Sequence, residues 1–284
     1  MSQTLGRIVK GVGGSYEVSC NNTVYTCAAK GIFRKKGITP LIGDRVEFEV
    51  LSEDELTGNV VNILERTNSM VRPRVANIDR AVVVFSVKRP AINVDLLDRF
   101  LILAEFEGID AMIVLNKCDI SDKAETELLR RTYEDIGYTV VLMSAVTLEG
   151  LDEFRRLLRG KVSVLAGPSG VGKSSIVNCV SPKLMETGEL SRKIDRGKHT
   201  TRHAELLRVD DDTFIVDSPG FTSLAVDGIG RDDIAGCFRE FAPFAQRCRF
   251  NDCKHLREPG CAVKEQVGHA ISADRYERYE RLVD

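Results

Sequence analysis

The alternation of hydrophobic and polar positions over residues 1–65 is typical of a small β-sheet protein. Short runs of alternating or β-branched residues are separated by turn signals such as Gly13-Gly14 and Asn21-Asn22. Short strands in a segment of this length predict a closed barrel, either of the OB type or SH3-like. The expected strands are residues 6–10, 16–20, 23–28, 44–50 and 58–64.

A basic loop at residues 31–37 interrupts these strands. It carries Arg34, Lys35 and Lys36 in succession. Such a loop is either a solvated turn or a phosphate-contacting loop of a nucleic-acid-binding barrel. Both interpretations stay open, and the second makes residues 1–65 a candidate OB-fold RNA-binding barrel.

The pattern changes after a polar stretch at residues 66–79, which we interpret as a linker. From residue 80, continuous apolar runs alternate with segments of helical spacing, which predicts βαβ units on a mainly parallel sheet. The expected strands are residues 81–87, 111–115, 139–143 and 161–166, and the expected helices are 94–107, 123–136, 151–158 and one from 173. Residues 228–284 lack strand runs and are expected to be mainly helical. The chain is therefore predicted to be α/β, with domains at 1–65, 80–227 and 228–284.

Composition narrows the class of protein. The 284 residues are 43% hydrophobic and 29% charged, as in ordinary globular proteins, and no apolar run is long enough to span a membrane. The first residues do not resemble an export signal, so the eight cysteines are expected to be thiols or metal ligands, and the protein cytoplasmic. The net charge of −2 means that a nucleic-acid partner needs a local basic patch. A monomer is the default expectation.

A phosphate-binding loop is the strongest motif. Residues 167–174 fit the pattern G-x-x-x-x-G-K-[ST], with an apolar run before them and a helical segment after them. The glycines allow successive N–H groups to point at a phosphate, Lys173 would reach the β- and γ-phosphates, and the Ser174 hydroxyl would bind Mg²⁺. The alternative is a glycine-rich turn with a chance Lys-Ser pair. The candidate ligands are Gly167, Pro168, Ser169, Gly170, Val171, Gly172, Lys173, Ser174 and Ser175.

A second motif selects the base. Asn116, Lys117, Cys118 and Asp119 follow a predicted buried strand. A carboxylate at this sheet edge can accept from guanine N1–H and its exocyclic amine, which adenine does not offer in that arrangement. Ser144 and Ala145 follow the next strand, and backbone N–H groups there can donate to guanine O6. Together with the phosphate loop these residues predict a guanine nucleotide site.

The γ-phosphate would be sensed by residues that follow the phosphate loop. Asp217 ends an apolar run and would reach Mg²⁺ through water, and the Gly220 amide can touch the γ-phosphate. Thr200 or Thr201 would complete the Mg²⁺ shell; the sequence does not separate them. The alternative is that the stretch around them is a basic surface loop.

Phe221 stands where many GTPases place a water-orienting glutamine. A phenyl ring cannot hydrogen-bond water, so we expect slow intrinsic hydrolysis. His199 is the candidate for orienting the attacking water; a solvated loop histidine is the alternative. We count His199 and Lys173 as the candidate catalytic residues.

A cysteine and histidine cluster lies in the last segment. Cys248, Cys253, His255 and Cys261 offer three thiols and one imidazole within fourteen residues, a typical closed shell for structural Zn²⁺. With four protein ligands no position stays open for catalysis. The surrounding basic residues, which fit either an RNA contact or a solvated face, are Arg247, Arg249, Lys254 and Arg257.

The motif order identifies a circular permutation, because the base motif precedes the phosphate loop, whereas ordinary GTPases have the reverse order. With the barrel, the GTPase motifs and the Cys/His tail, the chain resembles the bacterial small-subunit-dependent GTPase family, RsgA (also YjeQ), over essentially its whole length. The resemblance implies a cytoplasmic GTPase that is stimulated by the small (30S) ribosomal subunit, acts late in its maturation, contacts ribosomal RNA, is released on GTP hydrolysis and binds zinc through the same four residues. Arg202 departs from a threonine expected there, which leaves the Mg²⁺-binding threonine open.

Two other classes compete with this interpretation. The phosphate loop also fits guanylate-type kinases, although a kinase has no use for the Asn116–Asp119 motif. Alternatively, the chain is a non-catalytic RNA-binding module in which GTP only stabilises the fold.

Overall fold

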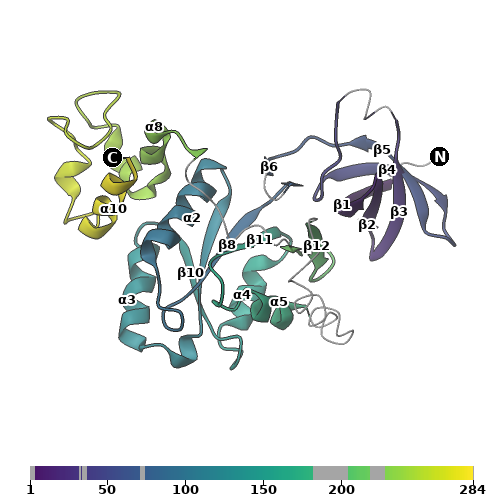
Figure 1. The fold of residues 1–284 in the computed structure, drawn as a ribbon, viewed down its shortest axis with the longest axis horizontal. Coiled ribbons are helices and arrows are strands. Elements are labelled where there is room, and N and C mark those ends of the chain that lie inside the picture. The colour runs from purple at the N-terminus through teal and green to yellow at the C-terminus, as the bar shows by residue number, and fades with distance from the viewer. Residues whose placement is uncertain are drawn as a thin grey trace.

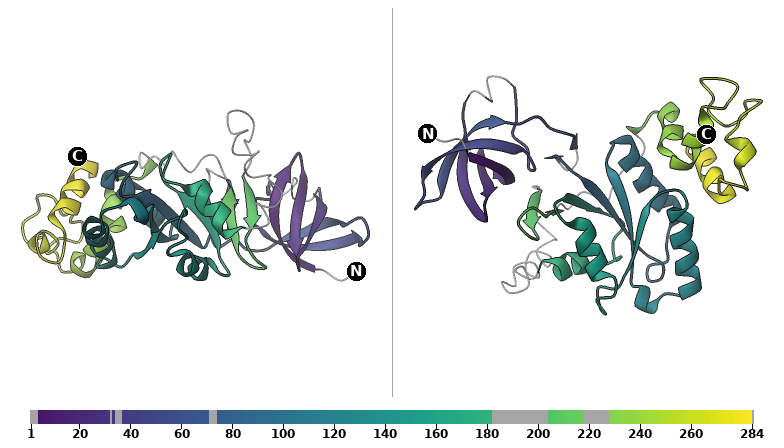
Figure 2. Two further views of the ribbon diagram at one scale, coloured as in Figure 1. Left: turned by 90° about the horizontal axis from the view of Figure 1, so that it is seen from below. Right: turned by 180° about the vertical axis from the view of Figure 1, so that it is seen from behind.

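Three modules lie in a row, with the β-barrel at one end, a sheet-and-helix domain in the middle and a small helical module at the other end (Figures 1 and 2). The computed structural model describes residues 4–31, 33, 37–70, 74–181, 204–217 and 228–283, and the side chain of Asp217 is outside this description. The two ends of the chain are far apart, one on each terminal module.

The N-terminal barrel is closed, with the strand order β1-β2-β3-β5-β4. β3 and β5 pair in parallel and the other pairs are antiparallel. Its core is a small apolar cluster around Ile8, Val18, Phe48 and Val60. The expected barrel is therefore present, and its connectivity is OB-like. The strands are β1 (Thr4–Val12), β2 (Ser15–Cys20), β3 (Thr23–Ala29), β4 (Arg45–Ser52) and β5 (Thr57–Ile63).

The stretch predicted to be a linker is packed against the barrel. It forms a small hairpin, β6 (Ser69–Met70) and β7 (Val75–Ala76). Arg66 donates to both oxygens of the fully buried Asp44, at 2.7 and 2.8 Å. Asn77 accepts from Thr67 N and donates to Gly43 O, at 2.9 and 3.1 Å. This polar sequence is thus held by a pair with a buried carboxylate and by side chains that bond to backbone; the domain boundaries themselves stay predictions.

The middle domain is a six-stranded sheet in the order β10-β9-β8-β11-β13-β12. All pairs are parallel except β12 with β13, as the continuous apolar runs predicted. The described strands are β8 (Arg80–Ser86), β9 (Asp110–Asn116), β10 (Thr139–Met143), β11 (Val162–Ala166), β12 (Glu205–Arg208) and β13 (Phe214–Asp217). β12, at the edge nearest the barrel, was not among the predicted strands (Figure 1).

Helices cover both faces of this sheet. Along β8, Ala81, Val83 and Phe85 share a core with α2 and α3, whereas Val82 and Val84 share one with α4 and α5. This alternation is the period of two expected of a strand buried on both sides. The helices are α2 (Val94–Phe106), α3 (Lys123–Glu134), α4 (Leu151–Leu158) and α5 (Lys173–Val180).

The C-terminal module consists of short helices and turns around a compact aromatic core. Phe238, Phe241 and Tyr279 pack with ring centroids 5.0–5.2 Å apart. Ile102 and Leu103 from α2 complete this core. Its elements are α8 (Arg231–Ile234), η4 (Ala235–Cys237), η5 (Arg239–Phe241), α9 (Ala242–Ala245), η6 (Lys264–Gln266) and α10 (Ala273–Val283). Across the described ranges, no helix has the length and apolarity to cross a membrane.

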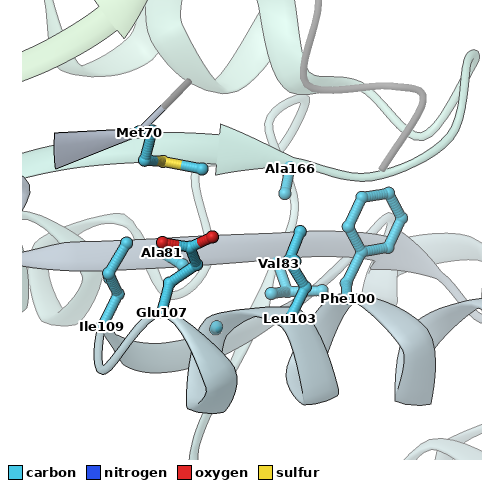
Figure 3. Close-up of a pocket in the computed structure, with 9 residues that line it drawn as sticks. Met70, Ala81, Val83, Phe100, Leu103, Glu107, Ile109 and Ala166 are labelled. Carbon is cyan, nitrogen blue, oxygen red and sulfur yellow. The ribbon is translucent and has the colours of Figure 1, made fainter. Parts of the chain in front are cut away.

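A narrow apolar cleft opens between α2 and the sheet (Figure 3). Met70 of the hairpin lies over it, Phe100 and Leu103 line it from α2, and the Glu107 carboxylate is at one side. It lies on the α2 face of the sheet, apart from the phosphate-loop helix α5 on the opposite face.

Candidate nucleotide and metal sites

The predicted phosphate loop lies at the point where the order of strands along the sheet reverses. Strands β8, β9 and β10 run one way in the order of the sheet, and β11, which enters the loop, lies on the other side of β8. Ligands of open α/β sheets bind in the crevice at such a switch point, outside the carboxyl ends of the strands. The fold therefore positions residues 167–174 where a ligand is expected.

The glycines of this loop are required by close contacts. Gly167, Gly170 and Gly172 all have positive φ angles of 135°, 81° and 97°. A Cβ at Gly167 would lie 2.1 Å from Val84 O, and one at Gly172 would lie 2.3 Å from Asn116 Nδ2. Both distances are shorter than any tolerated contact, so the loop has this shape only with glycine there.

The cation of the loop is folded back onto it. Lys173, the first residue of α5, donates to Gly167 O and Pro168 O at 2.7 and 2.8 Å. Burial lowers the pKa of this ammonium. Ser174 and Ser175 are exposed at the start of the same helix. The loop thus presents an ammonium and two hydroxyls at a helix N-terminus, which suits an anion.

Asn116 joins three segments that are distant in sequence. Its buried side chain donates to Val171 O of the phosphate loop at 2.8 Å and accepts from Ala145 N at 3.2 Å. The end of β9, the phosphate loop and the turn after β10 are therefore tied together by one amide. The structure brings the predicted base motif and the predicted phosphate loop into contact.

The other residues of the base motif lie around this amide. Lys117, in the left-handed conformation, donates to Gly170 O at 2.8 Å and to Arg89 O at 2.6 Å. Asp119 follows in the short helix η1 (Cys118–Ile120) and is exposed to solvent. Burial, together with the nearby Glu149 carboxylate, raises the pKa of Cys118 to about 11, so its thiol is neutral at physiological pH.

The turn after β10 is held by Ser144. This fully buried hydroxyl accepts from Val146 N at 3.3 Å and from Thr147 N at 3.1 Å. Its hydrogen bonds shape the backbone that carries Ala145 beside Asn116. A hydroxyl side chain at position 144 is therefore a local structural requirement of this turn.

The predicted γ-phosphate sensors lie outside the described residues. These are His199, Thr200, Thr201 and Gly220, together with the side chain of Asp217. The structure does place the strands beside them, with β12 beginning after residue 203 and β13 ending at Asp217. Their predicted roles stay predictions.

The four predicted zinc ligands converge. The ligand atoms of Cys248, Cys253, His255 and Cys261 all lie within 4.8 Å of one another. The Cys248 and Cys261 sulfurs are 3.9 Å apart, and His255 Nδ1 lies 3.6 and 3.4 Å from them. Ligands of a tetrahedral Zn²⁺ with bonds of about 2.3 Å to sulfur and 2.0–2.1 Å to nitrogen are separated by about 3.5–3.8 Å. The residues therefore fit a closed metal site.

Burial raises the pKa of the Cys253 thiol to about 12 and also raises that of Cys261, so these groups become thiolate ligands when a metal displaces their protons. Lys264 N donates to Cys261 Sγ at 3.4 Å, which stabilises a thiolate. Burial lowers the pKa of His255, which favours the neutral ring that a metal requires. Tyr276 donates to His255 O at 2.6 Å, and the ring of Phe241 packs edge-on to the imidazole. A metal here would link the loop to the aromatic core.

One segment that lies beside the base motif was not predicted from the sequence. Residues 86–90 connect β8 to α2, and Arg89 O receives the Lys117 ammonium while Ser86 donates to Pro90 O at 2.9 Å. The segment lies at the switch point but contains no recognisable motif. A proline shortly after a buried strand is the one signal that marks it as a turn.

Comparison with known proteins decides the family. The family model described as RsgA GTPase matches residues 63–227, and the model described as RsgA N-terminal domain matches residues 5–58. This chain belongs to the RsgA GTPase family. A protein of Alkaliphilus metalliredigens named small ribosomal subunit biogenesis GTPase RsgA is 46% identical over 98% of this chain and 96% of its own length. A Geobacillus kaustophilus protein of the same name is 45% identical over the same shares.

Solved structures agree with this assignment. YjeQ from Thermotoga maritima superposes with a TM-score of 0.85 at 33% identity, covering 99% of this chain and 98% of that one. YloQ, described as a circularly permuted GTPase, gives a TM-score of 0.83 at 33% identity and covers 99% and 94%. The fold of this RsgA family member is therefore the permuted GTPase fold, as the motif order predicted.

Proposed function

We propose that this chain hydrolyses GTP in response to the small ribosomal subunit, acts late in maturation of that subunit, and leaves it after hydrolysis. The observation that carries the proposal is the Asn116 amide, which ties the base motif to Val171 and Ala145. Such a tie gives one pocket for base and phosphates. The names of the RsgA relatives support the ribosomal partner.

In this proposal the base is read by Asp119 and the turn after β10. The Asp119 carboxylate accepts from guanine N1–H and the exocyclic amine. The Ala145 N–H, now 3.2 Å from Asn116 Oδ1, is shared with guanine O6. The Lys117 stem lies along the base while its ammonium holds Gly170 O.

The triphosphate is held by backbone N–H groups of residues 169–174 and by Lys173, which leaves the loop carbonyls for the β- and γ-phosphates. Mg²⁺, held by Ser174, Asp217 and Thr200 or Thr201, would offset the charge of the phosphates. His199 orients the attacking water. Because Phe221 cannot hydrogen-bond water, intrinsic turnover is slow, and the ribosomal subunit orders the catalytic residues.

The terminal modules provide the contacts with the subunit. We assign ribosomal RNA binding to the barrel and to the tail, with Zn²⁺ as the structural ion of the Cys248, Cys253, His255 and Cys261 cluster. Since the partner is a ribosomal subunit, we place the protein in the cytoplasm, and we expect it to act as a monomer.

The test is GTP turnover with and without purified small subunits. We expect many turnovers per enzyme with subunits, few without them, and no stimulation of Lys173→Ala. Phosphate release that stays below one per chain in both conditions would favour a non-catalytic RNA-binding module. Formation of GDP from GMP and ATP would favour a guanylate-type kinase.

A further inference from the structure

One aromatic ring on the tail is exposed among polar and charged neighbours. Phe250 is 40% exposed, and it is the one large hydrophobic side chain that the described part of the tail leaves so open to solvent. Its neighbours Arg249, Asn251 and Asp252 are exposed as well. Protein-binding surfaces are generally contiguous apolar patches. A lone ring surrounded by polar groups is a different kind of surface.

Two guanidinium groups lie next to aromatic rings on this loop. The Arg249 guanidinium is 5.5 Å from the centre of the Phe250 ring, and that of Arg247 is 5.0 Å from the Phe244 ring. Neither arginine has a salt bridge within the described ranges, whereas Arg239 and Arg275 of the same module are paired with carboxylates. The positive charges of Arg247 and Arg249 are therefore available to an anion.

The loop that carries Phe250 is fixed on both sides. Its flanking residues Cys248 and Cys253 belong to the metal cluster, and Cys253 N donates to Phe250 O at 3.3 Å. Arg249 N donates to Gly260 O at 3.0 Å, and a Cβ at Gly260 would be only 3.2 Å from Arg249 Cβ. A loop whose backbone is already fixed loses little conformational entropy on binding a ligand.

We propose that Phe250 and Arg249 form a platform on which an unpaired RNA base stacks, with Arg247 and Arg249 contacting the adjoining phosphates. This inference rests on the proposed function and specifies its RNA contact. Base stacking on an aromatic side chain is tolerant of sequence, and the guanidinium adds attraction for base and phosphate. The strand must be single, because the base faces of a duplex are already stacked.

The experiment measures RNA affinity by fluorescence anisotropy with the zinc-loaded full chain. The probes are a labelled single-stranded oligoadenylate RNA and an RNA duplex of equal length. We expect Phe250→Ala to weaken single-strand binding about tenfold and to leave duplex binding unchanged, because stacking is worth about 1–3 kcal/mol per base. Phe250→Tyr keeps the ring and should bind within about twofold of the parent protein.

Three further variants separate stacking from charge and from folding. Phe106→Ala removes another exposed phenylalanine, which is 45% exposed at the end of α2, and should change neither affinity. Arg249→Gln removes one phosphate contact. The slope of log affinity against log salt concentration for the single strand should therefore become less steep by about 0.7. If Phe250→Ala lowers the zinc content, Phe250→Leu replaces it as the test variant, because leucine keeps an apolar side chain at this position. Phe250→Leu should lose single-strand affinity as Phe250→Ala does.

Unchanged single-strand affinity in both Phe250→Ala and Phe250→Leu would overturn the platform, as would equal losses for both probes. Unchanged RNA affinity with weakened subunit binding would assign the ring to a protein partner instead. Stimulated GTP turnover of the parent protein is measured in parallel. If small subunits stimulate turnover of the parent protein while Phe250→Ala keeps its RNA affinity, only the platform is overturned. If small subunits do not stimulate turnover of the parent protein, the proposed function is overturned.

Discussion

The two terminal modules are joined to the GTPase domain by different kinds of interface. The barrel and its hairpin contribute Val9, Val75 and Ile78 to the same apolar core as the sheet residues Phe214 and Val216. The tail shares an apolar core with α2, but a buried ionic network lies at the junction. There Asp98 of α2 accepts from Arg275, from Arg278 and from the Tyr133 hydroxyl.

The ionic junction between the tail and α2 needs particular charged partners, whereas the apolar junction between the barrel and the sheet does not. Arg275 is 1% exposed and is paired with both Asp98 and Glu240, so each charge is compensated. Buried ion pairs require exact partners, and losing one partner leaves an uncompensated charge. Apolar packing needs no single exact partner, and volume-conserving substitutions in it usually cost less than about 1.5 kcal/mol. We infer that the orientation of the tail on α2 is fixed, whereas the barrel contact tolerates adjustment.

Loss of the metal should produce the largest difference in stability between the tail and the barrel. Structural Zn²⁺ contributes about 10–16 kcal/mol of apparent binding free energy in small zinc peptides, and in the tail the metal cluster packs directly against the aromatic core. We expect Cys261→Ser to abolish zinc binding, measured by elemental analysis, and to make the tail sensitive to protease while the barrel remains protected. Cys237→Ser, at a buried cysteine away from the cluster, is the control and should keep the zinc.

Breaking the ionic junction should be next in size. Arg275→Met removes the one cation paired with the buried Glu240 in the described part of the chain and leaves Asp98 with Arg278 alone, which costs about 3–5 kcal/mol. The loss should appear in denaturant unfolding. Arg281, on the same helix as Arg275, forms exposed pairs with Asp95 of α2 and with Glu277, and Arg281→Met should cost less than about 1 kcal/mol. Equal losses in the two variants would contradict the importance of the buried network.

A conservative change at the apolar junction should cost less. Ile78 is 2% exposed between hairpin and sheet, and Ile78→Val removes one methyl group. We expect a loss of about 0.5–1.5 kcal/mol in the same unfolding assay. A loss as large as that of Arg275→Met would show that the barrel is fixed as rigidly as the tail.

The ion pair between barrel and sheet edge should matter least. Lys10 Nζ lies 3.6 Å from Glu205 on β12, and the lysine is 40% exposed. Solvent screens such a pair, so Lys10→Met should change stability by at most about 1 kcal/mol. A larger loss in chemical denaturation would mean that charge, and not apolar packing, joins the barrel to the sheet.

The sequence predicted which motifs would meet at the sheet edge because the chemistry of a nucleotide site fixes residue types at fixed spacings. Gly167, Gly172 and Asn116 are examples, since backbone approach and amide geometry allow few alternatives. The sequence did not predict the junctions. Asp98 and Arg275 are charged residues on helices, and such side chains usually face water. Their burial depends on a partner 177 residues away in sequence, which no local pattern reveals.

The short strand β12 and the hairpin β6-β7 were also not predicted from the sequence. Four residues, Glu205–Arg208, give too short a pattern to distinguish a strand. The polar stretch around Asn68 and Asn77 resembles a linker because its order comes from side-chain bonds to distant backbone. The permuted order of the motifs, in contrast, was readable because each motif has its own chemistry.

A single pocket for base and phosphates is tested by changing its base specificity. Asp119→Asn replaces an acceptor with an amide whose N–H can donate to the C2 oxygen of xanthine. We predict that GTP affinity, measured by displacement of a fluorescent nucleotide, falls at least about tenfold and that XTP affinity rises, while Lys173→Ala weakens both. Unchanged GTP affinity in Asp119→Asn, with no gain for XTP, would show that the residues tied together by Asn116 do not hold the base.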